Sequence, residues 1–485
     1  MTLAQLAAAC GAELRGDGGL VATGITHRAQ DAAPGLVFAA LPGQRHHGLE
    51  FLGEALARGA VAVLSDRDPG APFPWLKSPN PRRATALAAW ALAGHPQRRL
   101  RLAGVTGTNG KSTVVDLIAR IASAAGMVSG SFTTIAYSLP HRSVAATNTT
   151  PEATVLAPLL AELVDNGGRL AAVEISSHAL ALDRVAGLEL DVAVWTNVSR
   201  DHLDFHRTME EYVAAKHHLE TYLRSEPRGR RVVNGDDPHL APLRARPRSG
   251  DLTFGLDGEN HVTARVSRQS LEGSLFTLQT PVGQVDVSLP LVGAHNILNA
   301  LAAAAAALTL GFPLSAIHTG LTTARPLPGR LELVTTTPCP VLVDYAHTPD
   351  ALTKVLGTLR EITKGRIIAV FGAGGDKDQG KRGPMGETVG RLADVPIVTS
   401  DNPRSEDPQA IIAAVMEGVR RSGNPRALAI PDRREAIAAA LAMADARCVV
   451  LIAGKGHETT QTFANHSIPF DDRQVARELA HRRRG

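Results

Sequence analysis

Gly104-Val105-Thr106-Gly107-Thr108-Asn109-Gly110-Lys111-Ser112-Thr113 decides the fold of this chain. The segment 100–103 before it predicts a short strand, and the segment 114–121 after it predicts a helix. A glycine-rich turn between a strand and a helix lets backbone N–H groups surround phosphate oxygens at the positive end of the helix. Lys111 can then reach the terminal phosphates, and the Ser112 hydroxyl can hold Mg²⁺. The stretch therefore predicts a nucleotide site rather than an ordinary strand-to-helix turn.

The spacing of this loop is tighter than the general phosphate-loop pattern, which places four residues between its first glycine and Gly-Lys. The full spacing is met only if Gly104 or Val105 begins the loop. The following residues are the candidates for ATP binding: Gly107, Thr108, Asn109, Gly110, Lys111, Ser112 and Thr113.

Length and composition bound the class of protein. A chain of 485 residues implies roughly three domains. The net charge of +4 is small and the basic residues are scattered, so we expect no nucleic-acid partner. Cys10, Cys339 and Cys448 lie too far apart for a disulfide framework or a zinc site, which fits a reducing cytoplasm. There is no signal-peptide pattern, and no uncharged stretch reaches the ~20 residues of a membrane span.

The order of predicted elements indicates an α/β protein of three domains. Residues 1–98 predict a small α/β domain that holds part of a substrate and ends in a helix at 82–93 and a linker at 94–99. Residues 99–326 predict a central ATP-binding domain on a parallel sheet. Residues 327–485 predict a C-terminal, Rossmann-like doubly wound sheet.

Polar residues follow several strands of the central domain. Glu174 ends an apolar strand, where a Mg²⁺ ligand would be useful. The segment 201–206 holds two histidines and two aspartates, which suits metal coordination or proton chemistry beside phosphate. Lys216 lies in a helix predicted over 210–223 and, by spacing alone, is an ordinary helix-face lysine. Segment 251–291 predicts a small antiparallel sheet, and Asn296 is expected to cap a helix over 297–310.

Four apolar strands of the C-terminal domain each end in a polar or glycine-rich loop. These loops lie at 344–347, 372–376, 400–404 and 453–458. In an open α/β sheet, ligands bind outside the carboxyl ends of the strands, so these loops outline a second ligand edge. The glycines at 372–375 lack the spacing of a dinucleotide fingerprint, which argues against NAD.

Five motifs together resemble the Mur ligase family over nearly the whole chain: Gly-Thr-Asn-Gly-Lys-Ser-Thr, Glu-Ile-Ser-Ser-His, Asn-Val-Ser-Arg-Asp-His-Leu-Asp, His-Asn-Ile-Leu-Asn and Asp-Tyr-Ala-His-Thr-Pro. The resemblance implies an ATP-dependent amide ligase that adds an amino acid to a UDP-N-acetylmuramoyl-peptide precursor of peptidoglycan. Asp401-Asn402-Pro403-Arg404 with Gly454 and Glu458 is similar to the member that joins a diamino acid, usually meso-diaminopimelate, to UDP-N-acetylmuramoyl-L-alanyl-D-glutamate.

The resemblance also implies residue roles. Lys111, Glu174, His202 and Lys216 would be catalytic; Mg²⁺ would be arranged by Ser112, Glu174, His202 and a carbamylated Lys216 (N6-carboxylysine). Asn296, Arg330, Asp344 and His347 would complete the ATP site. The muramoyl-dipeptide would be held by Thr26, Arg28, Thr149, Thr150, Ser176 and Arg184. Diaminopimelate would be held by Arg382, Asp401, Asn402, Pro403, Arg404, Gly454 and Glu458.

The implied mechanism passes through an acyl phosphate that the amine of the amino acid attacks. The Arg404 guanidinium suits the second carboxylate of diaminopimelate, and Glu458 suits the neighbouring ammonium. One departure lies at Thr26-His27-Arg28, where the family usually has Asp-Ser-Arg.

Several alternatives remain at this point. The same ligase could use lysine or ornithine. A folylpolyglutamate synthetase-like ligase is disfavoured by Asp401-Asn402-Pro403-Arg404 and by the extra N-terminal domain. A phosphate-loop ATPase switch without ligase activity is disfavoured by the second ligand edge. We expect a monomer.

Overall fold

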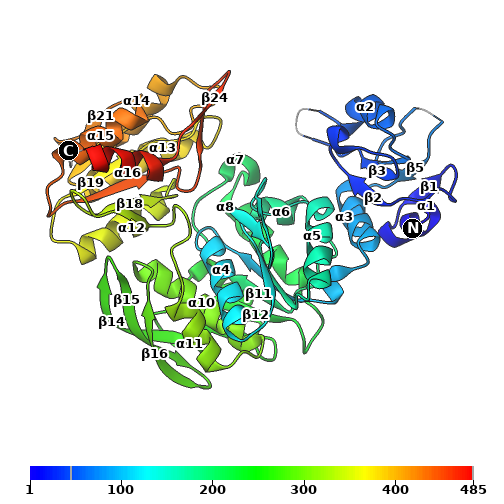
Figure 1. The fold of residues 1–485 in the computed structure, drawn as a ribbon, viewed down its shortest axis with the longest axis horizontal. Coiled ribbons are helices and arrows are strands. Elements are labelled where there is room, and N and C mark those ends of the chain that lie inside the picture. The colour runs from blue at the N-terminus through cyan, green and yellow to red at the C-terminus, as the bar shows by residue number, and fades with distance from the viewer. Residues whose placement is uncertain (44–45, 71, 483–485) are drawn as a thin grey trace.

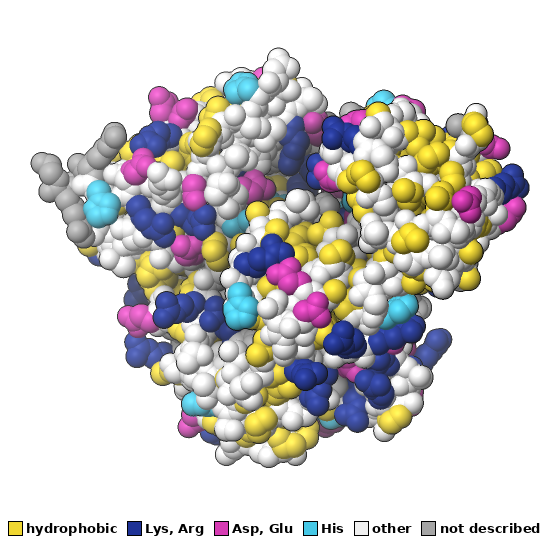
Figure 2. Space-filling view, turned by 45° about the vertical axis from the view of Figure 1, so that its right-hand side comes forward, with side chains coloured by type: hydrophobic (Ala, Val, Ile, Leu, Met, Phe, Trp, Pro, Cys, Tyr) yellow, Lys and Arg dark blue, Asp and Glu magenta, His cyan; other side chains and the backbone are white. Residues whose placement is uncertain are grey.

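A computed structural model describes residues 1–43, 46–70 and 72–482. The chain builds an N-terminal, a central and a C-terminal body in sequence order, and the central body joins the other two (Figure 1). On the face shown in Figure 2, Lys and Arg side chains lie beside Asp and Glu, and the surface is hollowed between the two upper bodies. Within the described ranges, no helix is long and apolar enough to cross a membrane.

The N-terminal body is a five-stranded sheet in the order β1-β5-β4-β3-β2, parallel except for β1. Its elements are α1 (Leu3–Cys10), β1 (Glu13–Arg15), β2 (Gly24–Thr26), β3 (Leu36–Ala39), α2 (Leu52–Ala57), β4 (Ala62–Ser65), β5 (Trp75–Lys77) and α3 (Pro81–Leu92). The expected linker at 94–99 is instead packed: it contains a short 3₁₀ turn, and the buried Gln97 donates to the Gly187 carbonyl. Trp90 of α3 also donates to the Ala186 carbonyl, so this junction is held by buried contacts.

The central body is an eight-stranded sheet in the order β13-β12-β11-β6-β10-β7-β8-β9. Its strands are β6 (Arg101–Thr106), β7 (Ser129–Phe132), β8 (Ala136–Ser138), β9 (Ser143–Ala145), β10 (Leu170–Glu174), β11 (Val192–Trp195), β12 (Arg230–Asn234) and β13 (Leu252–Phe254). The sheet is parallel from β13 to β7, and β8 and β9 form an antiparallel edge that the sequence did not predict. The phosphate loop follows β6, in the interior of this sheet.

Both faces of the central sheet are covered, which explains its nearly continuous apolar strands. In β10, Ala171 and Val173 join the core on the side of α5 (Ala153–Asp165). Leu170 and Ala172 join the opposite core with α4 (Lys111–Ala124) and α10 (Ala294–Thr309). Because side chains along a strand point alternately to the two faces of the sheet, the apolar residues of β10 pack against the helices on both faces.

Three expectations about this body were wrong in detail. The helix expected over 210–223 is α8 (Met209–His217) followed by a 3₁₀ turn, and the Trp195 indole N–H binds the Lys216 carbonyl near that junction. Asn296 does not cap α10: Gly293 takes the cap position, and the Asn296 amide donates to the Val292 carbonyl from inside the first turn. Gly104 lies within β6, so the phosphate loop begins at Gly107.

The small antiparallel sheet is β14 (Thr263–Ser270), β15 (Gly273–Thr280) and β16 (Gly283–Leu289). Residues 252–254 belong instead to the large sheet as β13. The remaining central helices are α6 (Ser177–Ala181), α7 (Leu203–His206), α9 (Ala241–Arg244) and α11 (Leu314–Thr322). The alanines at 302–307 are fully buried, because small side chains let α10 lie close to the sheet and to α4.

The C-terminal body is a six-stranded sheet in the order β17-β18-β22-β19-β20-β21. Its strands are β17 (Glu332–Thr335), β18 (Val341–Asp344), β19 (Ile367–Phe371), β20 (Val395–Val398), β21 (Leu428–Ala429) and β22 (Val449–Ala453). All are parallel except the edge strand β17. This confirms the doubly wound sheet and adds one antiparallel edge.

Helices cover both faces of this sheet. One core includes side chains of α12 (Pro349–Ile362), α13 (Arg382–Leu392) and α14 (Pro408–Arg421). The other includes side chains of α15 (Arg433–Met443) and α16 (Asp472–Arg482). The hairpin β23 (Thr460–Thr462) and β24 (Ser467–Pro469) follows the loop after β22.

Candidate active site

The phosphate loop is shaped by two glycines and by the end of β11. Gly107 and Gly110 have positive φ, and an added Cβ would collide with Thr196 Oγ1 or with Asn299 Oδ1, respectively. The Thr108 N–H donates to the Asn197 carbonyl at 2.8 Å. Only glycine fits both positions without displacing a neighbour. The loop therefore presents its backbone at the N-terminus of α4.

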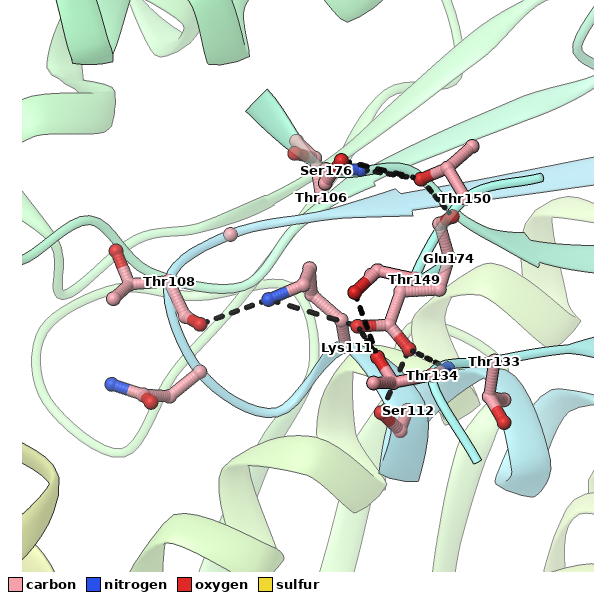
Figure 3. A network of polar contacts seen from close by, with 12 residues as sticks. Thr106, Thr108, Lys111, Ser112, Thr133, Thr134, Thr149, Thr150, Glu174 and Ser176 are labelled. Atoms are coloured by element: carbon pink, nitrogen blue, oxygen red, sulfur yellow. Dashed lines mark hydrogen bonds and ion pairs between the residues drawn. The ribbon is translucent and has the colours of Figure 1, made fainter. Parts of the chain in front are cut away.

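A buried polar network lies beside this loop (Figure 3). Ser112 Oγ donates to Glu174 Oε2 at 2.7 Å, and Lys111 Nζ lies 3.7 Å from Glu174 Oε1. The Thr134 N–H and hydroxyl both donate to Glu174 at 3.1 Å. Glu174 is only 2% exposed, so its charge is held by these donors rather than by water. The structure thus brings Lys111, Ser112 and Glu174 together as expected, and adds Thr134.

Two lysines approach the loop from different elements, of which Lys216 is buried and Lys111 is partly buried. Lys111 Nζ donates to the Thr108 carbonyl at 2.9 Å, and Lys216 Nζ donates to the Gly107 carbonyl at 2.7 Å. Burial lowers the pKa of Lys111, although Glu174 opposes this shift. Burial, with a further contribution from the charge of Lys111, lowers the pKa of Lys216 well below its usual value. Burial in this position therefore favours the uncharged form of the Lys216 amine over its charged form.

His202 lies at the rim of this network in an aromatic cluster. Its ring centroid is 4.7 Å from that of His178, and its Nε2 is 3.6 Å from Asp201 Oδ2. Burial lowers the pKa of His202 to about 3 and that of His178 to about 4. Both rings are therefore neutral at pH 7 and present nitrogen lone pairs.

Residues of the C-terminal body complete a cavity of about 190 Å³ above the phosphate loop. Arg330, Asp344 and His347 line it together with Asn296 of α10. The Asp344 carboxylate accepts the N–H groups of Leu331 and Ala346, and burial raises its pKa. All four residues expected to complete the ATP site therefore face this cavity.

The predicted dipeptide-binding residues fall into two groups. Thr150 Oγ1 donates to the Glu174 carbonyl and accepts the Ser176 N–H, and the Thr134 and Thr149 hydroxyl oxygens lie 3.2 Å apart. The carboxyl end of β10 therefore gathers Thr149, Thr150 and Ser176 (Figure 3).

The second group lies toward the N-terminal body. Arg184 Nε is 3.1 Å from Glu152 Oε1. At the end of β2, the Thr26 hydroxyl donates to the Arg28 carbonyl at 3.4 Å and accepts from the Arg28 N–H at 3.2 Å, and neither residue is in the Glu174 network. His27, which the sequence did not single out, contacts Thr154 of α5 at 3.1 Å and so joins the two bodies.

The predicted amino-acid residues meet at the carboxyl ends of β19, β20 and β22. Arg382 donates to both carboxylate oxygens of Glu406 at 2.7 and 2.8 Å, and Arg404 donates to the Gly375 carbonyl at 2.7 Å. The Asn402 amide donates to Glu458 Oε2 at 2.6 Å.

Asp401 and the glycine of the next loop pack against each other. An added Cβ at Gly454 would collide with Asp401 Oδ2, which is buried and has no hydrogen-bond partner among the described residues. Pro403 lies between Asn402 and Arg404, and its carbonyl packs against Gly375. Six of the seven predicted residues thus belong to the two loops after β20 and β22, and Arg382 is the first residue of α13.

Sequence reasoning missed several residues of these sites. Asp350 of α12 accepts from Asn109 of the phosphate loop at 3.1 Å and from Ser199 at 2.9 Å, which ties the C-terminal body to the loop. Tyr212 contacts Thr108 through its hydroxyl, and Lys216 lies over its ring. These are contacts between distant segments, for which local sequence gives no signal.

Two family models match the chain. Residues 105–307 match the model described as Mur ligase middle domain. Residues 329–456 match the model described as Mur ligase, glutamate ligase domain.

Curated relatives cover nearly the whole chain. The UDP-N-acetylmuramoyl-L-alanyl-D-glutamate–2,6-diaminopimelate ligase of Geobacillus kaustophilus is 44% identical over 92% of this chain and 92% of its own. That of Solibacter usitatus is 41% identical over 94% and 93%. The UDP-N-acetylmuramyl-tripeptide synthetase of Deinococcus radiodurans is 41% identical over 94% of both chains.

Solved structures agree in fold. A UDP-N-acetylmuramoyl-L-alanyl-D-glutamate–2,6-diaminopimelate ligase is 32% identical, with a TM-score of 0.68 over 100% of this chain and 99% of the other. MurF from Acinetobacter baumannii is 19% identical, with a TM-score of 0.71 over 99% and 98%, and shows the shared fold alone.

Proposed function

This chain belongs to the Mur ligase family, and from that premise we propose that it joins meso-diaminopimelate to UDP-N-acetylmuramoyl-L-alanyl-D-glutamate at the expense of ATP. One observation carries the proposal. A phosphate loop ends one sheet, a set of loops suited to an amphoteric amino acid ends another, and residues of both bodies line the cavity at the phosphate loop. A ligase needs these two edges to cooperate, whereas an ATPase switch does not need the second.

We assign the three parts of the reaction to the three bodies. Residues 1–98 would hold the UDP end of the substrate, with Thr26 and Arg28 beside it. Residues 99–326 would hold ATP and the reacting carboxylate, which Thr149, Thr150, Ser176 and Arg184 would orient. Residues 327–485 would hold the amino acid.

The donor set at the phosphate loop fits Mg²⁺ through oxygen ligands. Ser112 Oγ and the Glu174 carboxylate adjoin each other, and Mg²⁺ usually takes one or two protein ligands with phosphates and waters. No group of three or more His, Cys, Asp or Glu that could hold a metal is found in the described part of the chain, so a closed protein cage is not the arrangement here. When bound, Mg²⁺ would offset the charge of the phosphates.

Lys216 is suited to carbamylation. Its amine, in the uncharged form that burial favours, can attack CO₂, forming an N–C bond and losing one proton to water, which leaves a carbamate anion. The change would convert a buried hydrogen-bond donor into an oxygen ligand on the side of the phosphate loop near Gly107. An unmodified lysine that donates to the Gly107 carbonyl is poorly suited to hold Mg²⁺, whereas a carbamate, with His202 at the rim, would supply oxygen ligands.

Lys111 would stabilise negative charge as the γ-phosphoryl group passes to the substrate carboxylate. Preorganised cations of this kind act strongly in sites shielded from water. The amine of the amino acid then attacks the acyl carbon, a C–N bond forms, and phosphate leaves. Arg330 and His347 line the cavity from the C-terminal body, where they would restrict access of water to the acyl phosphate.

The amino-acid loops favour a distal end that carries both charges. Arg404 offers a guanidinium to a carboxylate, and Glu458 offers a carboxylate to an ammonium. Arg382, held by Glu406, would face the other carboxylate. Lysine ends in a bare ammonium and would leave Arg404 without an anion, so diaminopimelate is the preferred acceptor.

The test is phosphate release from ATP with Mg²⁺ and UDP-N-acetylmuramoyl-L-alanyl-D-glutamate. We expect release to require meso-diaminopimelate, with lysine and ornithine as poor substitutes. Release that prefers lysine or ornithine would keep the ligase and refute the Arg404 assignment. Release that needs no acceptor would favour the ATPase switch.

A further inference from the structure

A lysine that has no assigned role lies behind the amino-acid loops. Lys455, between Gly454 and Gly456, is 0% exposed and is one of the largest fully buried side chains in the described structure. Its Nζ donates to Asn402 Oδ1 at 3.1 Å, to Glu458 Oε2 at 3.2 Å and to the Thr460 carbonyl at 2.6 Å. The three protons of the ammonium are therefore matched by three acceptors from two loops and one hairpin.

These contacts fix the orientation of the Asn402 amide. Its Oδ1 accepts from Lys455 and also from the Thr462 N–H at 2.9 Å. Two donors at the oxygen leave the amide nitrogen to point at Glu458, which it reaches at 2.6 Å. The amide has only one orientation that satisfies all these groups.

The same contacts orient the Glu458 carboxylate. Both Asn402 Nδ2 and Lys455 Nζ donate to its Oε2. Within the described residues, no donor takes Oε1, and the Glu458 side chain is 30% exposed. One oxygen is thus held from behind while the other remains available to an incoming ammonium.

We propose that Lys455 is a positioning residue that sets Asn402 and Glu458 in the geometry that recognises the amino acid. It does not contact the amino acid itself, because it is enclosed behind the side chains that would. The inference rests on the proposed function, since it assumes that these loops bind the acceptor of the ligase. It goes further because it identifies Lys455 as the buried side chain that joins the Asn402 loop to the Glu458 loop.

The proposal separates Lys455 from an ordinary buried cation. A buried ion pair that only supports the fold changes stability and affects all substrates alike. Lys455 touches two of the predicted acceptor-binding side chains, so its loss changes acceptor recognition first. Removing one partner leaves Glu458 and Asn402 with unmatched groups, which then rotate or bind water.

The test compares Lys455→Met and Lys455→Gln with wild type in the phosphate-release assay. Lys455→Met is expected to raise the KM for meso-diaminopimelate by about tenfold to a hundredfold, while the KM values for ATP and the UDP-linked dipeptide change by less than about twofold. Lys455→Gln keeps an amide group that can donate, so its KM for meso-diaminopimelate is expected to lie between those of wild type and Lys455→Met. Thermal unfolding of each variant shows that the folded protein is being assayed.

Arg231→Met is the matched control. Arg231 is 1% exposed and pairs with Asp251 and Glu220 in the central body, away from the amino-acid loops. Its loss is expected to lower stability and leave the KM for the acceptor unchanged. An equal rise in that KM in Arg231→Met would show that Lys455 is only structural.

A double-mutant cycle with Asn402→Ala gives the sharper outcome. If Lys455 acts through Asn402, the KM for meso-diaminopimelate in the double variant rises by less than the product of the increases in the two single variants. Independent losses, or an unchanged acceptor KM in both Lys455 variants, would overturn the proposal. If the wild-type protein turns over with lysine and not with diaminopimelate, the choice of diaminopimelate is refuted, and the variants are compared with lysine as the acceptor. Phosphate release without any acceptor would overturn both the proposed function and the role of Lys455.

Discussion

The phosphate-loop edge of the central sheet and the amino-acid edge of the C-terminal sheet differ in how their cationic side chains are stabilised. At the first, the partly buried Lys111 and the buried Lys216 lie near the loop, and desolvation lowers the pKa of both amines. At the second, the cations have close partners: Arg382 binds Glu406, and Lys455 binds Glu458. At the first edge, the Glu174 carboxylate lies 3.7 Å from Lys111, and phosphates or a carbamate would add further negative charge. The second edge is held by these pairs, and among the described residues Asp401 Oδ2 still has no hydrogen-bond partner.

The difference separates chemistry from recognition. A site whose ionisable groups have shifted pKa values is suited to catalysis. A site whose charges are already paired and fixed is suited to selecting a ligand by shape and charge. Damage to the first edge should therefore reduce turnover, and damage to the second should reduce acceptor affinity.

The largest expected effect is a loss of stability when the buried Arg433–Asp472 pair behind the amino-acid edge is broken. Arg433 and Asp472 are fully buried, and Arg433 also donates to the Ser400 and Ala453 carbonyls, which precede the two acceptor loops. Arg433→Met leaves Asp472 buried without its partner and should destabilise the protein by about 3–5 kcal/mol in denaturant unfolding.

The double variant Arg433→Met with Asp472→Leu is the control for this prediction. It removes both charges and should recover most of the lost stability, because no unmatched charge remains. A double variant as unstable as the single one would contradict the account.

The next effect is at the phosphate-loop edge. Lys216→Ala removes the amine that would carry the carbamate and should lower kcat by about 10²–10³-fold, equal to about 2.7–4 kcal/mol. High bicarbonate should not restore activity, whereas wild type should incorporate labelled bicarbonate carbon. Lys364→Ala, at an exposed lysine, provides the control. Near-normal turnover in Lys216→Ala would remove the carbamate from the mechanism.

Arg404→Ala tests the amino-acid edge. It should weaken use of meso-diaminopimelate by about 2–4 kcal/mol, because a carboxylate loses its charged partner. The KM for ATP should stay the same, and discrimination against lysine should fall. Arg404→Lys keeps the charge but not the planar fork, so it should recover only part of the loss. An unchanged acceptor KM would argue against this role of Arg404.

The smallest effect concerns the contact between the two edges. Asp350→Ala removes the acceptor of Asn109 and Ser199 and should raise the KM for ATP roughly fivefold, equal to about 1 kcal/mol. The acceptor KM should not move. A change in acceptor KM that exceeded the change in ATP KM would place Asp350 in the recognition site instead.

Strand patterns predicted much of the fold and both edges. Glu174 was placed correctly because a buried parallel strand leads to the ligand edge, and the same reasoning located Asp401 and Asn402. Asn296 was misread as a cap because α10 begins earlier, at Ala294, with Gly293 in the cap position. The break after His217 was missed because it coincides with a tertiary contact, the Trp195 indole at the Lys216 carbonyl.

Residues defined by long-range contacts were beyond the reach of sequence patterns. The interest of Lys216 came from family resemblance, since its spacing marks an ordinary helix-face lysine. Lys455 has no local signal either: its three acceptors come from loops and a hairpin that only the fold brings together. His27 contacts Thr154, 127 positions away in the chain. Such pairings depend on how the bodies pack.

The division between chemistry and recognition is tested most directly by positional isotope exchange in ATP, with the UDP-linked dipeptide present and no amino acid. The exchange reports reversible formation of the acyl phosphate. We predict exchange in wild type and in Arg404→Ala, and none in Lys216→Ala. Exchange that requires diaminopimelate, or that is lost in Arg404→Ala, would contradict the account, because the amino-acid edge would then take part in the phosphoryl transfer itself.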